Sequence, residues 1–181
     1  MSVLCAVVTL YADVLRKDNF MFKRSLISLV FLAGLAGNVF AGPQYVDGTG
    51  FAISGYDAVS YFNGGPKAGK KEFTTTYNGA KFAFSTAANL AAFQASPGKY
   101  APAYDGHCAY GVAQGGKVPA NPKLWKIVGG KLYLNITQSV QGDWQADIPG
   151  NLKKSTVNWK KLASKGASTR AIPAFSSTAP N

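Results

Sequence analysis

Apolar and polar residues alternate with the period of a β-strand on both sides of one short turn. Residues 73–77 and 82–84 carry aromatic side chains two or four positions apart, and Asn78-Gly79 stands between these runs. Asn and Gly tolerate the positive φ angles that a tight hairpin turn requires. The pattern therefore predicts an antiparallel β-hairpin over residues 73–84.

A second hairpin is predicted further along the chain. Residues 124–128 and 131–135 are rich in Leu, Ile, Val and aromatic residues, and they flank Gly129-Gly130. A pair of glycines can form the same kind of turn. The two hairpins share no sequence motif, and we find no other internal repeat.

Helices are predicted around and after the hairpins. Ser85 or Thr86 can cap a helix that ends at Ala95, ahead of Pro97. Two further runs with helical spacing are separated by Pro149, and they contain Val140, Trp144 and Ile148, then Leu152, Thr156, Trp159 and Ala163. This order of strands and helices predicts a single small α+β domain with two β-hairpins and several short helices, preceded by a signal peptide.

The signal peptide is predicted from the residues that follow Met21. Lys23 and Arg24 form a basic start, residues 25–37 are uncharged and largely apolar, and residues 39–41 form a cleavage site. The uncharged run is short for a membrane span. We therefore expect an exported protein, periplasmic or secreted, without a stable membrane anchor.

Four segments are expected in the chain as a whole. Residues 1–20 are interpreted as a start-site extension, 21–41 as the signal peptide and 42–163 as the folded domain. Residues 164–181 are rich in Ser, Thr, Ala and Pro, and we predict that they form a disordered tail.

Charge and composition restrict the partners and the metal sites. Lys and Arg number 19 against 8 Asp and Glu, which gives a net charge of +11. Such a charge suits anionic lipid, polysaccharide or nucleic acid, and export argues against nucleic acid. Residues 42–181 contain one cysteine and one histidine, which excludes a multi-cysteine zinc module.

That cysteine and histidine are adjacent, as His107 and Cys108. Neighbouring residues on a straight strand point to opposite faces, but a bend at Asp105-Gly106 would let both side chains reach one ion. Copper or zinc would be the metal, with further ligands coming from a second chain if needed. The alternative is a buried, chemically silent cysteine beside a surface or capped histidine.

Motifs of common enzyme classes are absent from the sequence. It contains no GxSxG, HExxH, Walker loop or C-x-x-C-H haem motif. A catalytic Cys–His pair is disfavoured, because such partners usually come from distant parts of a chain. We therefore expect a protein that is not an enzyme.

Several sequence blocks together resemble exported bacterial YHS-domain proteins, and they read GYDAVSYF at 55–62, YNGAKFAFS at 77–85, YDGHCAYG at 104–111 and KLYLN at 131–135. The resemblance extends to about Leu162. It implies a relationship to metal-binding modules of the TRASH type and an undefined activity. Metal-binding relatives carry one Cys after the first strand region and another on the helix after the hairpin. This chain has Gly55-Tyr56-Asp57 in the first of these stretches and Asn89 within Ser85 to Leu90 in the second, and neither stretch has a thiol.

These observations together predict an exported YHS-domain protein that binds a small ligand or a soft metal ion. The metal site would be His107 and Cys108, and the ligand-binding residues would be Tyr56, Asp57, Asp105 and Tyr110. Two alternatives are a structural or protein-interaction module without metal and a thiol-dependent redox protein. The sequence does not determine the oligomeric state.

Overall fold

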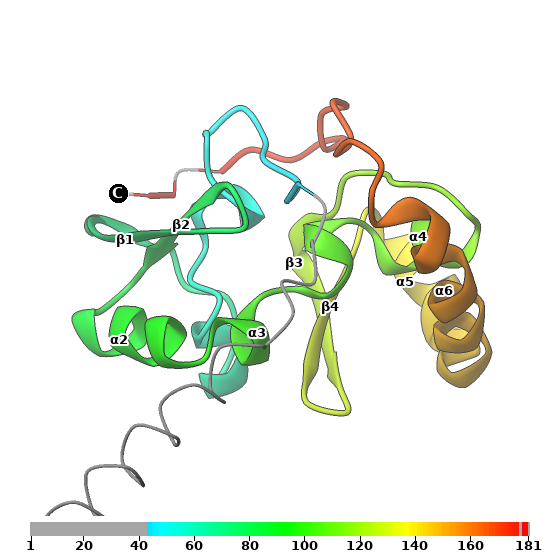
Figure 1. Cartoon of the computed structure of the whole chain (residues 1–181), viewed down its shortest axis with the longest axis horizontal. Helices are drawn as coiled ribbons and strands as arrows, with labels where there is room; N and C mark the ends of the chain where they lie inside the picture. Colours follow the sequence, from blue (N-terminus) through cyan, green and yellow to red (C-terminus); the bar gives the residue numbers. More distant parts are fainter. Residues whose placement is uncertain (1–42, 178, 181) are drawn as a thin grey trace, which may run out of the picture. The chain divides into compact units, whose positions relative to one another are not determined.

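The computed structural model describes residues 43–177 and 179–180. The predicted start-site extension and signal peptide lie outside the described residues. The described region contains two antiparallel two-stranded sheets and five α-helices, which confirms the predicted α+β class (Figure 1). Within it, no helix combines the length and the apolar character needed to cross a membrane.

The first hairpin consists of β1 (Lys70–Tyr77) and β2 (Ala80–Phe84). Tyr77 pairs with Ala80, so Asn78 and Gly79 form a two-residue turn. Their φ angles are 47° and 75°, as a type I′ turn requires. The predicted hairpin is confirmed, and β1 begins three residues earlier than the sequence pattern indicates.

The second hairpin consists of β3 (Asn121–Val128) and β4 (Lys131–Asn135). Val128 pairs with Lys131 across Gly129 and Gly130, whose φ angles are 55° and 71°. This hairpin also follows the prediction, because glycine adopts two successive positive φ angles without a steric cost.

Each hairpin leads into a helix of nine residues, α2 (Ala87–Ala95) and α5 (Gln138–Ala146). Threonine caps both helices: the hydroxyls of Thr86 and Thr137 accept the backbone N–H three residues further on, at 3.1 and 3.3 Å. These bonds satisfy N–H groups that have no partner inside the helix. Of the two caps considered for the first helix, the structure therefore selects threonine.

Two further helices and several short elements complete the fold. α3 (Pro97–Tyr100) and α6 (Ile148–Leu162) each begin with proline in the first turn, a position that needs no N–H donor. The remaining elements are the 3₁₀ turns η1 (Ile53–Gly55), η2 (Ser60–Asn63) and η3 (Ala103–Gly106), and the helix α4 (Ala109–Ala113).

The fold contains an internal repeat, which corrects the sequence analysis. The strands and longer helices of residues 52–100, the first half, recur 51 residues later in residues 103–162, the second half. β1 and β3 begin at 70 and 121, β2 and β4 at 80 and 131, α2 and α5 at 87 and 138, and α3 and α6 at 97 and 148. The strand register shifts at equivalent places too, between Lys70 and Thr74 and between Asn121 and Trp125.

Backbone geometry repeats where the side chains do not. Ile53, Ser54 and Gly55 have φ angles of 48°, 52° and 77°, and their counterparts Tyr104, Asp105 and Gly106 have 56°, 53° and 77°. Only the glycine is identical in the two triplets. The repeat escaped detection because mainly residues at turns and caps are retained, whereas the core side chains of the two halves differ.

The core is aromatic in both halves. Phe82, Phe84 and Phe93 are almost completely buried, and the Phe93 ring lies 4.9 and 5.0 Å from the other two ring centroids. In the second half, Trp144 is fully buried and packs on Tyr133 at 5.4 Å. Rings at these distances contribute beyond their buried area.

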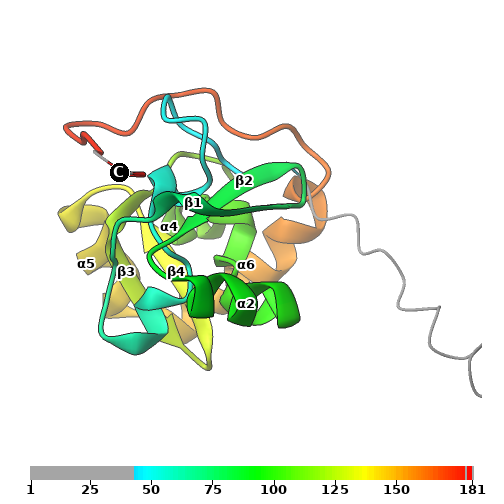
Figure 2. The same cartoon turned by 90° about the vertical axis from the view of Figure 1, so that its left-hand side faces the viewer.

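The C-terminal segment, predicted to be disordered, instead lies against the domain. Figure 2 shows it running past the first described residues of the chain. Tyr45 donates its hydroxyl hydrogen to the carbonyl of Arg170 at 2.9 Å, and Ser177 donates to the carbonyl of Ser54 at 2.9 Å. Ile172 is only 8% exposed. A few specific contacts thus order a segment whose composition is typical of disorder.

Candidate functional site

His107 is completely buried, and both of its ring nitrogens are hydrogen-bonded. Nδ1 lies 2.9 Å from the carbonyl of Tyr104, to which it donates, and Nε2 accepts the backbone N–H of Ser168 at 3.1 Å. This arrangement selects the neutral ring with its hydrogen on Nδ1. Burial lowers the pKa of His107 to about 4, with Lys117 adding to the effect and the bond to Tyr104 opposing it.

Cys108 is also completely buried. Its Sγ donates to Asn135 Oδ1 at 3.5 Å and accepts the N–H of Gly111 at 3.4 Å, so the thiol caps α4. Burial raises the pKa of Cys108, and hydrogen bonds from neighbouring backbone groups offset only part of this effect. The thiol is therefore protonated at neutral pH, the form that is neither nucleophile nor metal ligand.

The two predicted metal ligands contact different surroundings. The bend expected at Asp105-Gly106 is present, because Tyr104 and Asp105 have positive φ angles. Yet His107 contacts the C-terminal segment and Cys108 contacts β4. Among the residues that the structure describes, no three His, Cys, Asp or Glu side chains converge. Metal binding at this dipeptide stays a prediction.

Asp57 is a fully buried carboxylate that accepts five hydrogen bonds. Oδ1 accepts the N–H groups of Val59 and Ser60 at 2.9 and 3.2 Å. Oδ2 accepts the N–H and hydroxyl of Ser85 at 2.8 and 2.6 Å and the Asn89 amide at 2.6 Å. The carboxylate thus joins η2, the end of β2 and the start of α2, which gives it a structural role.

The internal repeat relates Asp57 to Cys108, which lies 51 positions later. Each residue precedes a helical turn and follows a glycine with a φ angle of 77°, Gly55 or Gly106. Asp57 accepts bonds from side chains of its own half, and Cys108 bonds to Asn135 of its half. The cysteine thus occupies the place that the buried aspartate occupies in the first half.

Asp105 is the predicted ligand-binding residue that does line a cavity. It is 7% exposed; Oδ1 accepts the Gln44 amide at 3.2 Å, and Oδ2 is buried without a hydrogen-bond partner among the described residues. Burial raises the pKa of Asp105 to about 6, against an opposing effect of Lys117. A buried carboxylate oxygen that accepts no hydrogen bond destabilises the fold. Asp105 is also the acidic residue in the lining of this cavity.

The cavity has a volume of about 260 Å³ and lies where the two halves meet. Its lining comprises Gln44, Tyr77, Asn78, Gly98, Ala101, Pro102, Ala103, Asp105, Lys131 and Tyr133. Lys131 Nζ donates to the carbonyl of Gly98 at 2.7 Å and so connects β4 with α3. One carboxylate, one ammonium group and two phenol rings therefore surround the same space.

The other predicted ligand-binding residues lie elsewhere. Tyr56 and Asp57 are buried in the first half, and the N–H of Tyr110 donates to Asn135 Oδ1 at 3.2 Å. Lys131 and Tyr133 also line the cavity, although they were not predicted as site residues. No local pattern marks them, because the turn of one hairpin and a strand of the other form the cavity.

Comparisons with known proteins leave the family open. No protein-family model matches the chain, and no match emerges among curated proteins or solved structures.

Proposed function

We propose that this chain is an exported, non-catalytic binding module of the YHS type that holds a small zwitterion, such as an amino acid, in the Asp105 cavity. One observation carries the proposal: a nine-tenths buried carboxylate with an unpartnered oxygen lines a cavity that also contains a lysine. Opposite charges at fixed positions recognise a ligand with opposite charges of its own.

The cavity lining supports this class of ligand. An ammonium group of the ligand would take the place of the Gln44 amide beside Asp105, and the ligand carboxylate would bind Lys131. A lysine has three donors, and Lys131 uses one of them on Gly98. The rings of Tyr77 and Tyr133 would contact the apolar part. A volume of about 260 Å³ is slightly below the ~300–1,000 Å³ of typical drug-sized sites, which favours a small molecule.

The geometry of His107 and Cys108 supports the metal and thiol alternatives less well. A metal would have to displace the N–H of Ser168 or the carbonyl of Tyr104 from His107, and Cys108 would have to lose a proton that its burial retains. Titration with copper(I) and zinc, comparing wild type with His107→Ala and Cys108→Ser, tests this. Stoichiometric binding lost in both variants would restore the metal site.

The ligand experiment uses calorimetric titration with glycine, alanine, methylamine and acetate at pH 7.5. We expect the two amino acids to bind more tightly than methylamine or acetate, which each lack one charged group. Asp105→Asn and Lys131→Gln should each weaken binding about tenfold or more, since a charge-assisted hydrogen bond contributes roughly 1.5–3 kcal/mol.

Two matched variants control for a general loss of charge. Asp143→Asn on the exposed face of α5 and Lys71→Gln on the exposed part of β1 remove the same charges, and neither residue lines the cavity. They should leave binding unchanged. If no compound of the panel binds, or if the controls weaken binding equally, the proposed ligand class is wrong and a structural module becomes the better description.

Export is tested separately. We expect the exported protein to begin just after Ala41, so N-terminal sequencing of protein recovered outside the cytoplasm should read Gly-Pro-Gln. A chain that retains Leu10 or Tyr11 contradicts both the predicted cleavage and the predicted start at Met21.

A further inference from the structure

Helix α6 presents a cationic face around an exposed valine. Lys153, Lys154, Lys160 and Lys161 are all exposed, and at 3.6 residues per turn they fall within about one third of the helix circumference. Val157 lies at the centre of this stripe and is 58% exposed. The helix contains no Asp or Glu, so no acidic side chain of its own neutralises this face.

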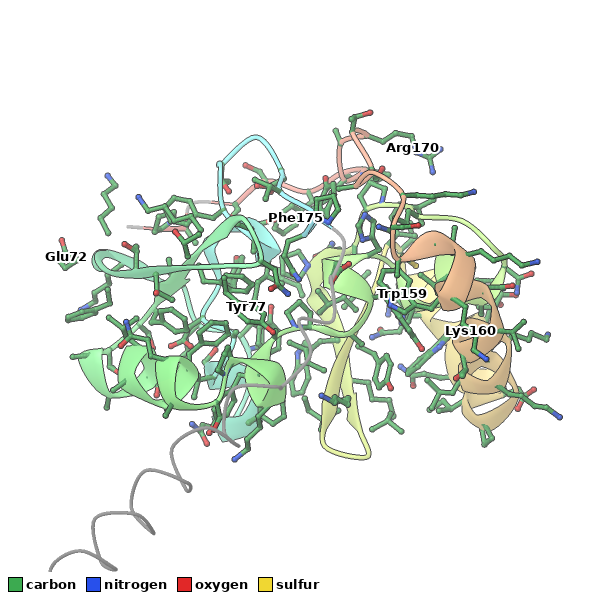
Figure 3. The ribbon with its side chains drawn as sticks, in the orientation of Figure 1. Glu72, Tyr77, Trp159, Lys160, Arg170 and Phe175 are labelled. Carbon is green, nitrogen blue, oxygen red and sulfur yellow. The ribbon has the colours of Figure 1, made fainter. Side chains whose placement is uncertain are left out.

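The opposite side of α6 packs on the domain. Trp159 lies 5.3 Å from the Tyr104 ring, and Lys117 Nζ lies 5.0 Å from the Trp159 ring. Figure 3 shows Trp159 extending from α6 toward the rest of the domain and Lys160 on the helix beside it. Since packing holds the helix in place, the lysines are presented in one fixed orientation.

An apolar hollow adjoins the lysines. It has a volume of about 460 Å³ and is lined by Ala113, Gly150, Lys153, Lys154, Val157 and Asn158. Asn158 donates its amide to the carbonyls of Val112 and Ala113, at 3.0 Å each, so its polar group is already engaged. Small residues at 113 and 150 leave the space open, and the lysine chains border it.

We infer that this face of α6 is a docking surface for an anionic lipid bilayer. The lysine ammonium groups would contact lipid phosphates. The methylene groups of the lysines, Val157 and the apolar hollow would face the upper part of the acyl chains, just below the headgroups. Charge complementarity identifies the partner as anionic. The exposed valine and the apolar hollow favour lipid over a soluble polyanion, which offers no apolar surface.

Vesicle co-sedimentation of the exported form, expected to span residues 42–181, tests this inference. The wild-type protein should bind vesicles of one-third phosphatidylglycerol in phosphatidylcholine and should bind pure phosphatidylcholine vesicles much more weakly. Each basic residue near an anionic membrane contributes about fivefold in affinity. Lys153→Gln with Lys154→Gln should therefore weaken binding about 25-fold.

The adjacent pair Lys70 and Lys71 is a matched control, because both residues are exposed and lie on β1. Their double Gln variant loses the same charge and should bind within about threefold of wild type. Val157→Trp should bind more tightly, because tryptophan favours the membrane interface. This variant gains binding, so a folding defect cannot imitate its result.

Three outcomes would overturn the inference. The first is equal weakening by the two lysine pairs, which would show only a net-charge effect. The second is binding to polyphosphate at least as tight as binding to anionic vesicles, with no change in Val157→Trp. The third is equal binding to neutral and anionic vesicles.

Discussion

Replacing Asp57 by Asn tests whether the buried carboxylate holds the first half together. The change keeps the side-chain volume and leaves one oxygen to accept the N–H groups of Val59 and Ser60. The new NH₂ group would face the N–H of Ser85 and the amide of Asn89, which both now donate to Oδ2 at 2.8 and 2.6 Å. At least two partly buried donors therefore lose their acceptor.

The magnitude follows from those two bonds. A hydrogen bond to a charged group contributes roughly 1.5–3 kcal/mol, so the loss should be about 4 kcal/mol. A small domain is stable by only about 5–15 kcal/mol. With a urea m-value of about 2 kcal/mol/M, the unfolding midpoint should fall by about 2 M.

Urea unfolding followed by far-UV circular dichroism measures this change. Asp143→Asn on exposed α5 is the control, and it should change stability by less than about 0.5 kcal/mol. A midpoint for Asp57→Asn within about 0.5 M of wild type would refute the structural role assigned to the carboxylate.

Four further substitutions have defined outcomes. His107 has a pKa of about 4 in the fold against an ordinary 6.5, so the unfolded chain binds its proton first. As pH falls from about 6.5 to 4, the stability of wild type should drop relative to that of His107→Gln by up to about 3 kcal/mol. The opposite effect of Asp105, whose pKa burial raises to about 6, is common to both proteins, so urea titrations of the two across this pH range measure the His107 contribution. Gly130→Ala, at a φ of 71°, should destabilise the fold by about 1 kcal/mol. Gly142→Ala, in an open helical position, should instead stabilise the fold by about 0.5–1 kcal/mol. Equal shifts of the melting temperature in the two variants would contradict this. Phe93→Ala should lower the free energy of unfolding by about 3–5 kcal/mol. An unchanged melting temperature would show that Phe93 does not contribute to the core.

Much of the local structure could be predicted because it depends on residues close together in the chain. Asn78-Gly79 determines a turn through the φ angles that the two residues tolerate, and the register of the first hairpin follows from it. Thr86 begins a helix because its hydroxyl reaches an N–H three residues away. Such interactions need no knowledge of the rest of the fold.

The internal repeat leaves a weak signal in the sequence, and the tertiary structure is needed to recognise it. Its signal is present in the sequence as pairs of residues 51 positions apart, such as Gly55 with Gly106 and Thr86 with Thr137. These few identities become meaningful only when strands, helices and backbone angles coincide at the same spacing. The change from Asp57 to Cys108 shows how far the side chains of the two halves differ.

By itself, the sequence determined the two hairpins, the start of the helix after the first hairpin and the α+β class, because backbone preferences and side-chain period act over a few residues. The tertiary structure decided the burial, the hydrogen bonding and the pKa of the side chains that could carry chemistry. Burial lowers the pKa of His107, and Ser168, 61 residues away, donates its N–H to the ring. Asp105 contacts Gln44 across the same separation. Burial and hydrogen bonding depend on which distant segments meet, and these contacts set pKa, access and the cavity.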